Sequence, residues 1–161
     1  MAVYPQRILS LFAGIAGLDL GIRLVFPESR IVGFVERESY AASVLVARME
    51  DKTLDEAPIW SDLKTFDPEP WRGRVDIITG GFPCQPFSVA GRNRKETEKA
   101  SDERNLWPDV ARLAGELGHP ALFCENVPGI LRYYWDVIKP ELQGMGYSVA
   151  EGLYTAAETG A

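Results

Sequence analysis

Short apolar runs alternate along this sequence with stretches in which apolar residues recur every three or four positions. The runs are suited to burial on both faces and lie at Arg7–Phe12, Arg30–Val35, Val75–Thr79 and Ala121–Cys124. The helical stretches lie at Leu18–Val25, Ser39–Met49, Leu106–Leu117 and Ile130–Gln143. Strands that alternate with helices build βαβ units, so the pattern predicts an α/β fold with a mainly parallel sheet flanked by helices. Ile59–Trp60 and Tyr147–Thr155 are further candidate strands.

Length and composition exclude several classes of protein. The 161 residues suffice for one domain with a core and are too few for two of ordinary size. The most apolar stretch, Ile8–Ile22, is shorter than the roughly 20 residues that a membrane span needs. Two cysteines cannot build a disulfide framework, so we expect a soluble, cytoplasmic protein. The net charge of −6 argues against a stand-alone nucleic-acid binder.

The residues that follow each strand are the first candidates for a site, because parallel sheets bind ligands beyond their carboxyl ends. Ala13–Gly17 carries two glycines spaced G-x-x-G, which favours either a turn around a nucleoside or a plain strand–helix turn. Glu36 follows the second strand, where a carboxylate either accepts ribose hydroxyls or is a solvated charge. Asp62 follows Ile59–Trp60 and either meets an adenine amine or is an ordinary turn residue.

The turn after Val75–Thr79 is more specific. Two glycines and two prolines bracket Cys84, and such a stiff turn can aim a nucleophilic sulfur before the substrate arrives. The alternative is a small buried hydrophobe, the role we expect for Cys124. Glu125 leaves the last strand at the same edge of the sheet and can donate a proton to a substrate nitrogen. Gly91–Arg104 is polar except for Ala100, which favours a lid over a plain surface loop.

The order and intervals of these motifs resemble the catalytic half of a DNA (cytosine-5)-methyltransferase. The motifs are Phe12-Ala13-Gly14-x-x-Gly17, Glu36, Gly81 to Ser88 and Glu125-Asn126-Val127, and the resemblance runs from about Arg7 to Ala161. It implies a Rossmann-like fold that binds S-adenosylmethionine and releases S-adenosylhomocysteine, with no metal. The implied cofactor residues are Phe12, Gly14, Glu36, Asp62 and Leu63, with Pro83 and Leu106 closing the site.

The resemblance also implies roles in catalysis and DNA binding. Cys84 corresponds to the nucleophile that adds to carbon 6 of a flipped cytosine in double-stranded DNA, and Glu125 to the residue that contacts nitrogen 3. Asn126 corresponds to a residue that braces the Pro-Cys turn. Ser88 and Arg104 correspond to contacts that form when the loop closes over DNA. The implied setting is bacterial or phage restriction-modification.

Three further expectations concern the extent of the domain, the alternative functions and the target sequence. Residues 1–161 are expected to form the catalytic and cofactor-binding domain without a target-recognition domain or the final helix of the family, so the chain is a fragment or needs a second chain. The alternatives are a non-catalytic module that binds cofactor or a partner, and a tRNA cytosine-5 methyltransferase of the same family. The target sequence is not encoded in these residues.

Overall fold

A parallel five-stranded sheet forms the centre of the chain in a computed structural model, which describes residues 6–83 and 104–159. The strands are β1 (Arg7–Leu11), β2 (Arg30–Val35), β3 (Ile59–Trp60), β4 (Ile77–Gly80) and β5 (Ala121–Cys124). Their order in the sheet is β3-β2-β1-β4-β5, and every pairing is parallel. The predicted α/β fold is therefore confirmed.

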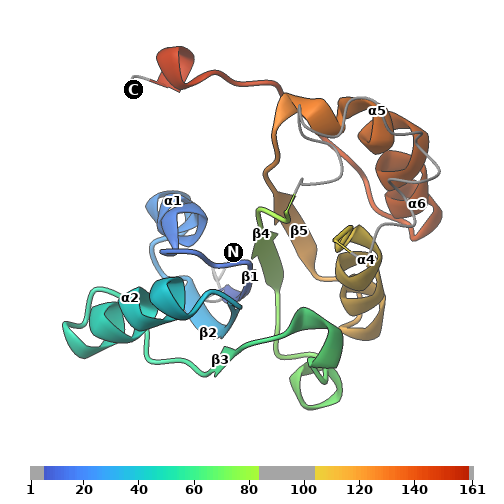
Figure 1. The fold of residues 1–161 in the computed structure, drawn as a ribbon. Coiled ribbons are helices and arrows are strands. Elements are labelled where there is room, and N and C mark those ends of the chain that lie inside the picture. Colours follow the sequence, from blue (N-terminus) through green and yellow to red (C-terminus); the bar gives the residue numbers. More distant parts are fainter. Residues whose placement is uncertain (1–5, 84–103, 160–161) are drawn as a thin grey trace. The chain divides into compact units, whose positions relative to one another are not determined.

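The described residues form two compact units, and Figure 1 labels their helices and strands. The first unit comprises residues 6–83 and 106–125 and holds the whole sheet. The second comprises residues 104–105 and 126–159. Each unit is treated by itself below.

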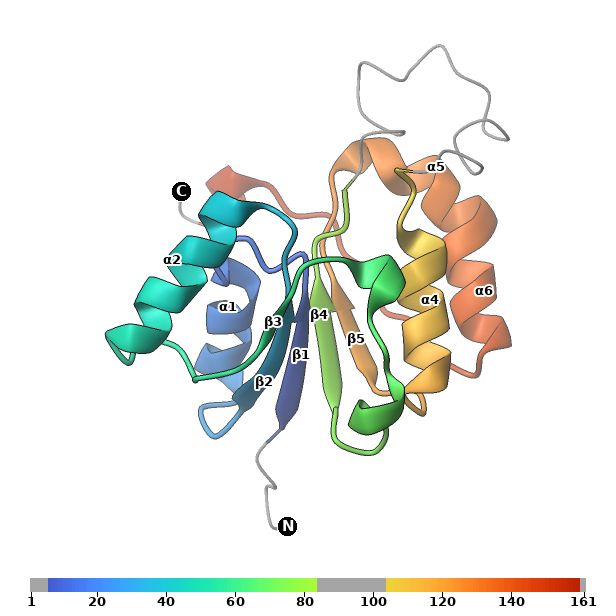
Figure 2. The same ribbon diagram turned by 60° about the horizontal axis from the view of Figure 1, so that its bottom comes forward.

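Helices cover both faces of the sheet in the first unit. The helices α1 (Gly17–Val25) and α2 (Ser39–Glu50) lie on one face, and α4 (Trp107–Glu116) lies on the other (Figure 2). The 3-10 turns η1 (Leu63–Thr65) and η2 (Glu69–Trp71) connect β3 to β4. This arrangement places the turns that follow the strands together at the carboxyl end of the sheet, where ligands bind in such folds.

The core on the α1 and α2 face depends on an irregularity in β2. Ile8 of β1 pairs with Ile31, but the next residue of β1 pairs with Gly33, so Val32 is an extra residue. The shift lets Ile31 and Phe34 enter the same cluster although they are three positions apart. Strict alternation along β2 would have sent one of them to the opposite face.

The second unit consists mainly of one interrupted helix. It begins with the 3-10 turn η4 (Pro128–Ile130) and continues through α5 (Leu131–Tyr133), the π-helical η5 (Tyr134–Ile138) and α6 (Lys139–Gly144). Pro140 has no N–H to donate to the carbonyl four residues earlier, and the π-helical register accommodates this missing bond. No helix among the described residues is long and apolar enough to span a membrane.

The strand expected at Tyr147–Thr155 is wrong. Among the described residues this segment pairs with no strand, and it runs as irregular backbone up to the 3-10 turn η6 (Ala156–Thr159). Lys139 forms an ion pair with Glu151 and ties the segment to α6. An apolar run without a neighbouring strand cannot form a ladder, whatever its β-propensity.

Candidate cofactor-binding and catalytic site

The turn after β1 has an unusual backbone. Phe12, Gly14 and Ala16 all adopt left-handed conformations, with φ of 54°, 52° and 63°. The Ala16 N–H donates to the carbonyl of Ala13 at 2.7 Å and closes the turn before α1 begins. Glycine adopts this conformation freely, whereas Phe12 and Ala16 are strained there. Such strain is typical of turns that a fold holds in one conformation for a ligand.

Glu36 joins this turn to the end of β2. One carboxylate oxygen accepts the Gly14 N–H at 2.7 Å, and the other accepts the Glu38 N–H at 2.7 Å. The Glu36 residue is only 8% exposed. The alternative of a solvated charge at a strand end is therefore wrong for Glu36. Each oxygen has a second lone pair, so the carboxylate can still accept a ribose hydroxyl.

Asp62 and Leu63 follow β3. One Asp62 oxygen accepts the Lys64 N–H at 3.0 Å and caps the turn η1, and Leu63 is buried behind it. Arg112 of α4 donates to the Leu63 carbonyl at 3.4 Å and also pairs with Glu116. This capping bond fits the alternative given by the sequence, in which Asp62 is an ordinary turn residue.

The segment after β4 lies close to the end of β5. The Glu125 N–H donates to the Gly80 carbonyl at 3.1 Å. A side chain at Gly81 would place its Cβ 3.2 Å from a Glu125 carboxylate oxygen, so glycine permits this close approach. Glu125 itself is exposed rather than set in a hydrophobic environment. Phe82 is buried against Trp107, with ring centroids 5.8 Å apart, and this contact supports Pro83.

Cys84 and Ser88 lie outside the described residues, as does most of the predicted lid. Cys124 is exposed at the end of the edge strand β5, so the expectation of a core position for it is wrong. Protein atoms around its sulfur nevertheless desolvate the thiol and raise its pKa to about 12. Cys124 is thus a neutral, weakly nucleophilic thiol near pH 7.

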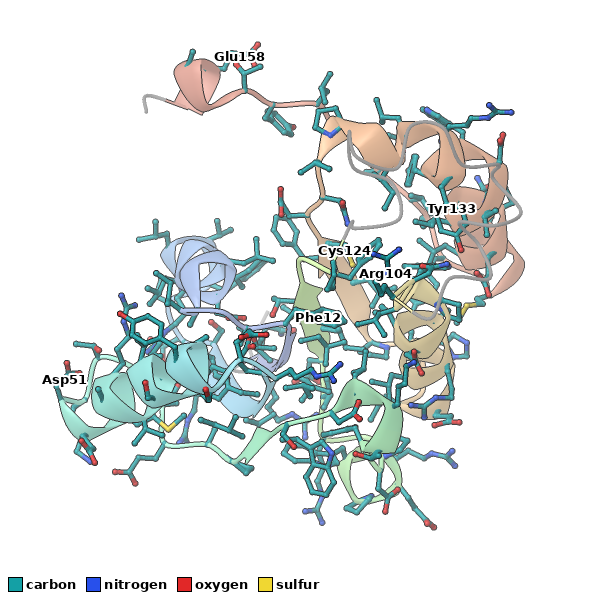
Figure 3. The ribbon with its side chains drawn as sticks, in the orientation of Figure 1. Phe12, Asp51, Arg104, Cys124, Tyr133 and Glu158 are labelled. Carbon is teal, nitrogen blue, oxygen red and sulfur yellow. The ribbon has the colours of Figure 1, made fainter. Side chains whose placement is uncertain are left out.

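Arg104 and Asn126 belong to the second unit. The Asn126 side-chain oxygen accepts the Val127 N–H at 3.0 Å. Next to Arg104, Asn105 donates to the hydroxyl of Tyr133 at 2.9 Å and is nearly buried. Arg104 and Tyr133 are labelled in Figure 3. The link between Asn105 and Tyr133 was not predicted, because its two residues are 28 positions apart.

Seven residues predicted to bind the cofactor lie in the first unit, mostly at or just beyond the carboxyl ends of its strands. They are Phe12, Gly14, Glu36, Asp62, Leu63, Pro83 and Leu106. Phe12 is labelled in Figure 3. Sequence reasoning did not assign a role to Asp19, which is buried in α1 and accepts hydrogen bonds from Ser10 at 2.7 Å and Thr79 at 2.5 Å. An acidic residue inside an apolar stretch was the available signal.

Residues 6–161 match the family model of the C-5 cytosine-specific DNA methylases. The chain belongs to this family. It is 32% identical over 158 residues to the Type II methyltransferase M.PspPI of a Psychrobacter strain, covering 94% of this chain and 36% of that protein. It is 34% identical over 142 residues to M.CviJI of Paramecium bursaria Chlorella virus IL3A, covering 88% of this chain and 36% of that protein. The chain therefore spans about a third of the length of these relatives.

Solved structures support the fold. The S. pombe Dnmt2 methyltransferase has a TM-score of 0.65 at 18% identity, covering 90% of this chain and 42% of that one. The Spodoptera frugiperda DNMT2 mutant has a TM-score of 0.63 at 22% identity, covering 86% of this chain and 40% of that one. The sheet of this family member is thus the Rossmann-like sheet of the methyltransferases.

Proposed function

We propose that this chain is the catalytic region of a DNA (cytosine-5)-methyltransferase that methylates carbon 5 of a flipped cytosine in double-stranded DNA. The family match is the finding that supports the reaction class. The observation that carries the proposal for the site is the link from Glu36 to the strained turn at Gly14. This link presents a buried carboxylate where a nucleoside can bind in such a sheet.

The residues fit S-adenosylmethionine. Among the described residues, chain neighbours aside, no atom lies within 4 Å of the position that a Cβ at Gly14 would take, so a ligand can approach the backbone there. Glu36 would accept the ribose hydroxyls, and Asp62 with Leu63 would border the adenine. Phe12, Pro83 and Leu106 would enclose the rest of the cofactor. When bound, S-adenosylmethionine supplies an activated methyl group and leaves as S-adenosylhomocysteine.

The protein's part in the reaction is covalent activation of the base. The Cys84 thiolate adds to carbon 6 while Glu125 donates a proton to nitrogen 3, which makes carbon 5 nucleophilic. After carbon 5 is methylated, a solvent water accepts its proton, and the electron pair left on carbon 5 expels the Cys84 sulfur from carbon 6 as the thiolate. Glu125 recovers the proton from nitrogen 3. In this scheme Asn126 braces the turn that carries Cys84, and Ser88 and Arg104 contact DNA.

The proposal extends to the biological setting, which is protection of DNA in restriction-modification. The two relatives named above carry Type II names, and this naming supports the setting.

The base must leave the duplex to reach Cys84, because the reacting carbons are stacked inside B-DNA.

Methyl transfer by the full gene product that contains these residues tests the proposal. The protein is incubated with labelled S-adenosylmethionine and either duplex DNA or tRNA, and the nucleosides are identified by mass spectrometry. We expect 5-methyldeoxycytidine from DNA and none from tRNA. Methylation of tRNA alone would support the alternative substrate, and no methylation of either would support a non-catalytic module.

Two variants serve as controls for that assay. Cys84→Ala should abolish methylation, because alanine has no sulfur to add to carbon 6. Cys124→Ala should retain it, because Cys124 has no part in the proposed reaction. Both cysteines are small, so neither change should prevent folding.

A further inference from the structure

Asp19 is a buried carboxylate that the proposed reaction does not use. It lies in the first turn of α1 and is 1% exposed. Ser10 of β1 and Thr79 of β4 donate to its two oxygens at 2.7 Å and 2.5 Å. Within the described residues, no lysine, arginine or histidine forms an ion pair with Asp19. Its charge is stabilised by hydrogen bonds but is not neutralised.

These hydrogen bonds favour the ionised form of Asp19. The pKa of Asp19 is nevertheless raised, because burial outweighs the hydrogen bonds from Thr79, Ser10 and the Asp19 backbone N–H, which lower it. A carboxylate accepts from all three partners at once, whereas in a protonated carboxyl one oxygen carries its own O–H, which would have to donate to Ser10 or Thr79. Above this raised pKa, Asp19 holds a negative charge between α1 and the strands β1 and β4.

The two partners of Asp19 lie near the carboxyl ends of β1 and β4, shortly before the turns that carry proposed cofactor residues. Ser10 precedes Phe12 by two residues, and Thr79 precedes Pro83 by four. The N-terminus of a helix carries a partial positive charge, which normally favours an anion such as phosphate. In α1 the carboxylate of Asp19 lies in the first turn and offsets the partial positive charge of the helix N-terminus. The turn from Phe12 to Ala16 is therefore suited to a cationic group.

We propose that Asp19 determines charge specificity, favouring the cationic sulfonium of S-adenosylmethionine over the neutral thioether of S-adenosylhomocysteine. The inference rests on the proposed function, since it concerns the same site. The two ligands differ by one methyl group and one positive charge. The ratio of their affinities therefore isolates the effect of a nearby charge from effects on the rest of the site.

The test measures both dissociation constants by calorimetry at pH 8, for the wild-type protein and Asp19→Asn. At an effective dielectric of about 20, two unit charges change an equilibrium by roughly tenfold if they lie on the order of 10 Å apart. We expect Asp19→Asn to lower the preference for S-adenosylmethionine relative to S-adenosylhomocysteine by about threefold to tenfold. Ser10→Ala retains the Asp19 charge and removes one of its donors, so it should leave the ratio of the two affinities unchanged.

A second variant covers the case in which Asp19→Asn does not fold. The triple change Ser10→Ala, Asp19→Leu, Thr79→Val replaces the whole polar cluster by apolar groups, a kind of replacement that proteins often tolerate. It should lower the ratio by the same factor. An unchanged ratio in a folded variant that lacks the charge overturns the inference alone. Wild-type protein that binds neither ligand overturns the proposed cofactor site and the inference with it.

Discussion

Replacing Glu36 by Gln should weaken both the fold and the cofactor site. The Glu36 carboxylate accepts two backbone N–H groups, from Gly14 and Glu38, each at 2.7 Å. Glutamine has the same size but only one acceptor oxygen, so its NH₂ group would face one of these N–H donors. A hydrogen bond to a charged acceptor contributes about 1.5–3 kcal/mol. We therefore expect Glu36→Gln to lower the free energy of unfolding by about 1–3 kcal/mol.

The same substitution should reduce cofactor affinity. A lost charged hydrogen bond to a ribose hydroxyl corresponds to about a tenfold to hundredfold rise in the dissociation constant. Urea denaturation measures the first effect, and calorimetry with S-adenosylmethionine measures the second. Glu38→Gln is the matched control, because Glu38 is exposed and its backbone N–H still donates to Glu36. Reduced stability with unchanged affinity would show that Glu36 only links the two turns and does not bind ribose.

Three further substitutions test the packing and the charges of the fold. A Cβ at Gly33 would lie 2.7 Å from the Trp71 ring, so Gly33→Ala should destabilise the protein by about 1–3 kcal/mol in urea denaturation. At Gly21 in α1, no side chain or more distant backbone of the described residues lies within 4 Å of an added Cβ, so Gly21→Ala should instead stabilise the protein by about 0.5–1 kcal/mol. Equal effects of the two substitutions would refute the packing. The hydrogen bond from the Arg7 side chain lowers the pKa of Asp76. Its stabilising effect is thus present above the unfolded pKa of about 4 and is lost as pH falls through the lower folded value. Asp76→Asn should lower the free energy of unfolding by about 1 kcal/mol or less at pH 7, because the paired side chains of Arg7 and Asp76 are 40% and 32% exposed. A difference from wild type that does not shrink in acid would refute the assignment.

The sheet could be predicted from sequence because its strands are short, apolar and separated by helical periodicity. Ile59–Trp60 and the four longer runs all became strands. The irregularity at Val32 and the missing strand at Tyr147–Thr155 could not be predicted in the same way. Both depend on which neighbouring strand is available, and local composition carries no information about that neighbour.

The site could be predicted only in part. Sequence reasoning placed Glu36 at the end of a strand, and the structure adds its link to Gly14. It left Asp19 without a role, because Ser10 and Thr79 meet it only through the sheet order that places β1 beside β4. It assigned Cys124 to the core, although β5 is an edge strand whose residues are largely exposed. The ligand roles of the seven cofactor residues are still predictions.

Covalent trapping on DNA tests the central claim, that Cys84 is the nucleophile of a cytosine-5 methyltransferase. The full gene product is incubated with S-adenosylmethionine and duplex DNA containing 5-fluorocytosine, whose fluorine cannot leave as the proton does. Peptide mapping by mass spectrometry then identifies the residue that carries the nucleotide. We expect the adduct on Cys84, its loss in Cys84→Ser, and normal trapping in Cys124→Ser. An adduct on Cys124, or trapping that persists in Cys84→Ser, would contradict the proposed mechanism.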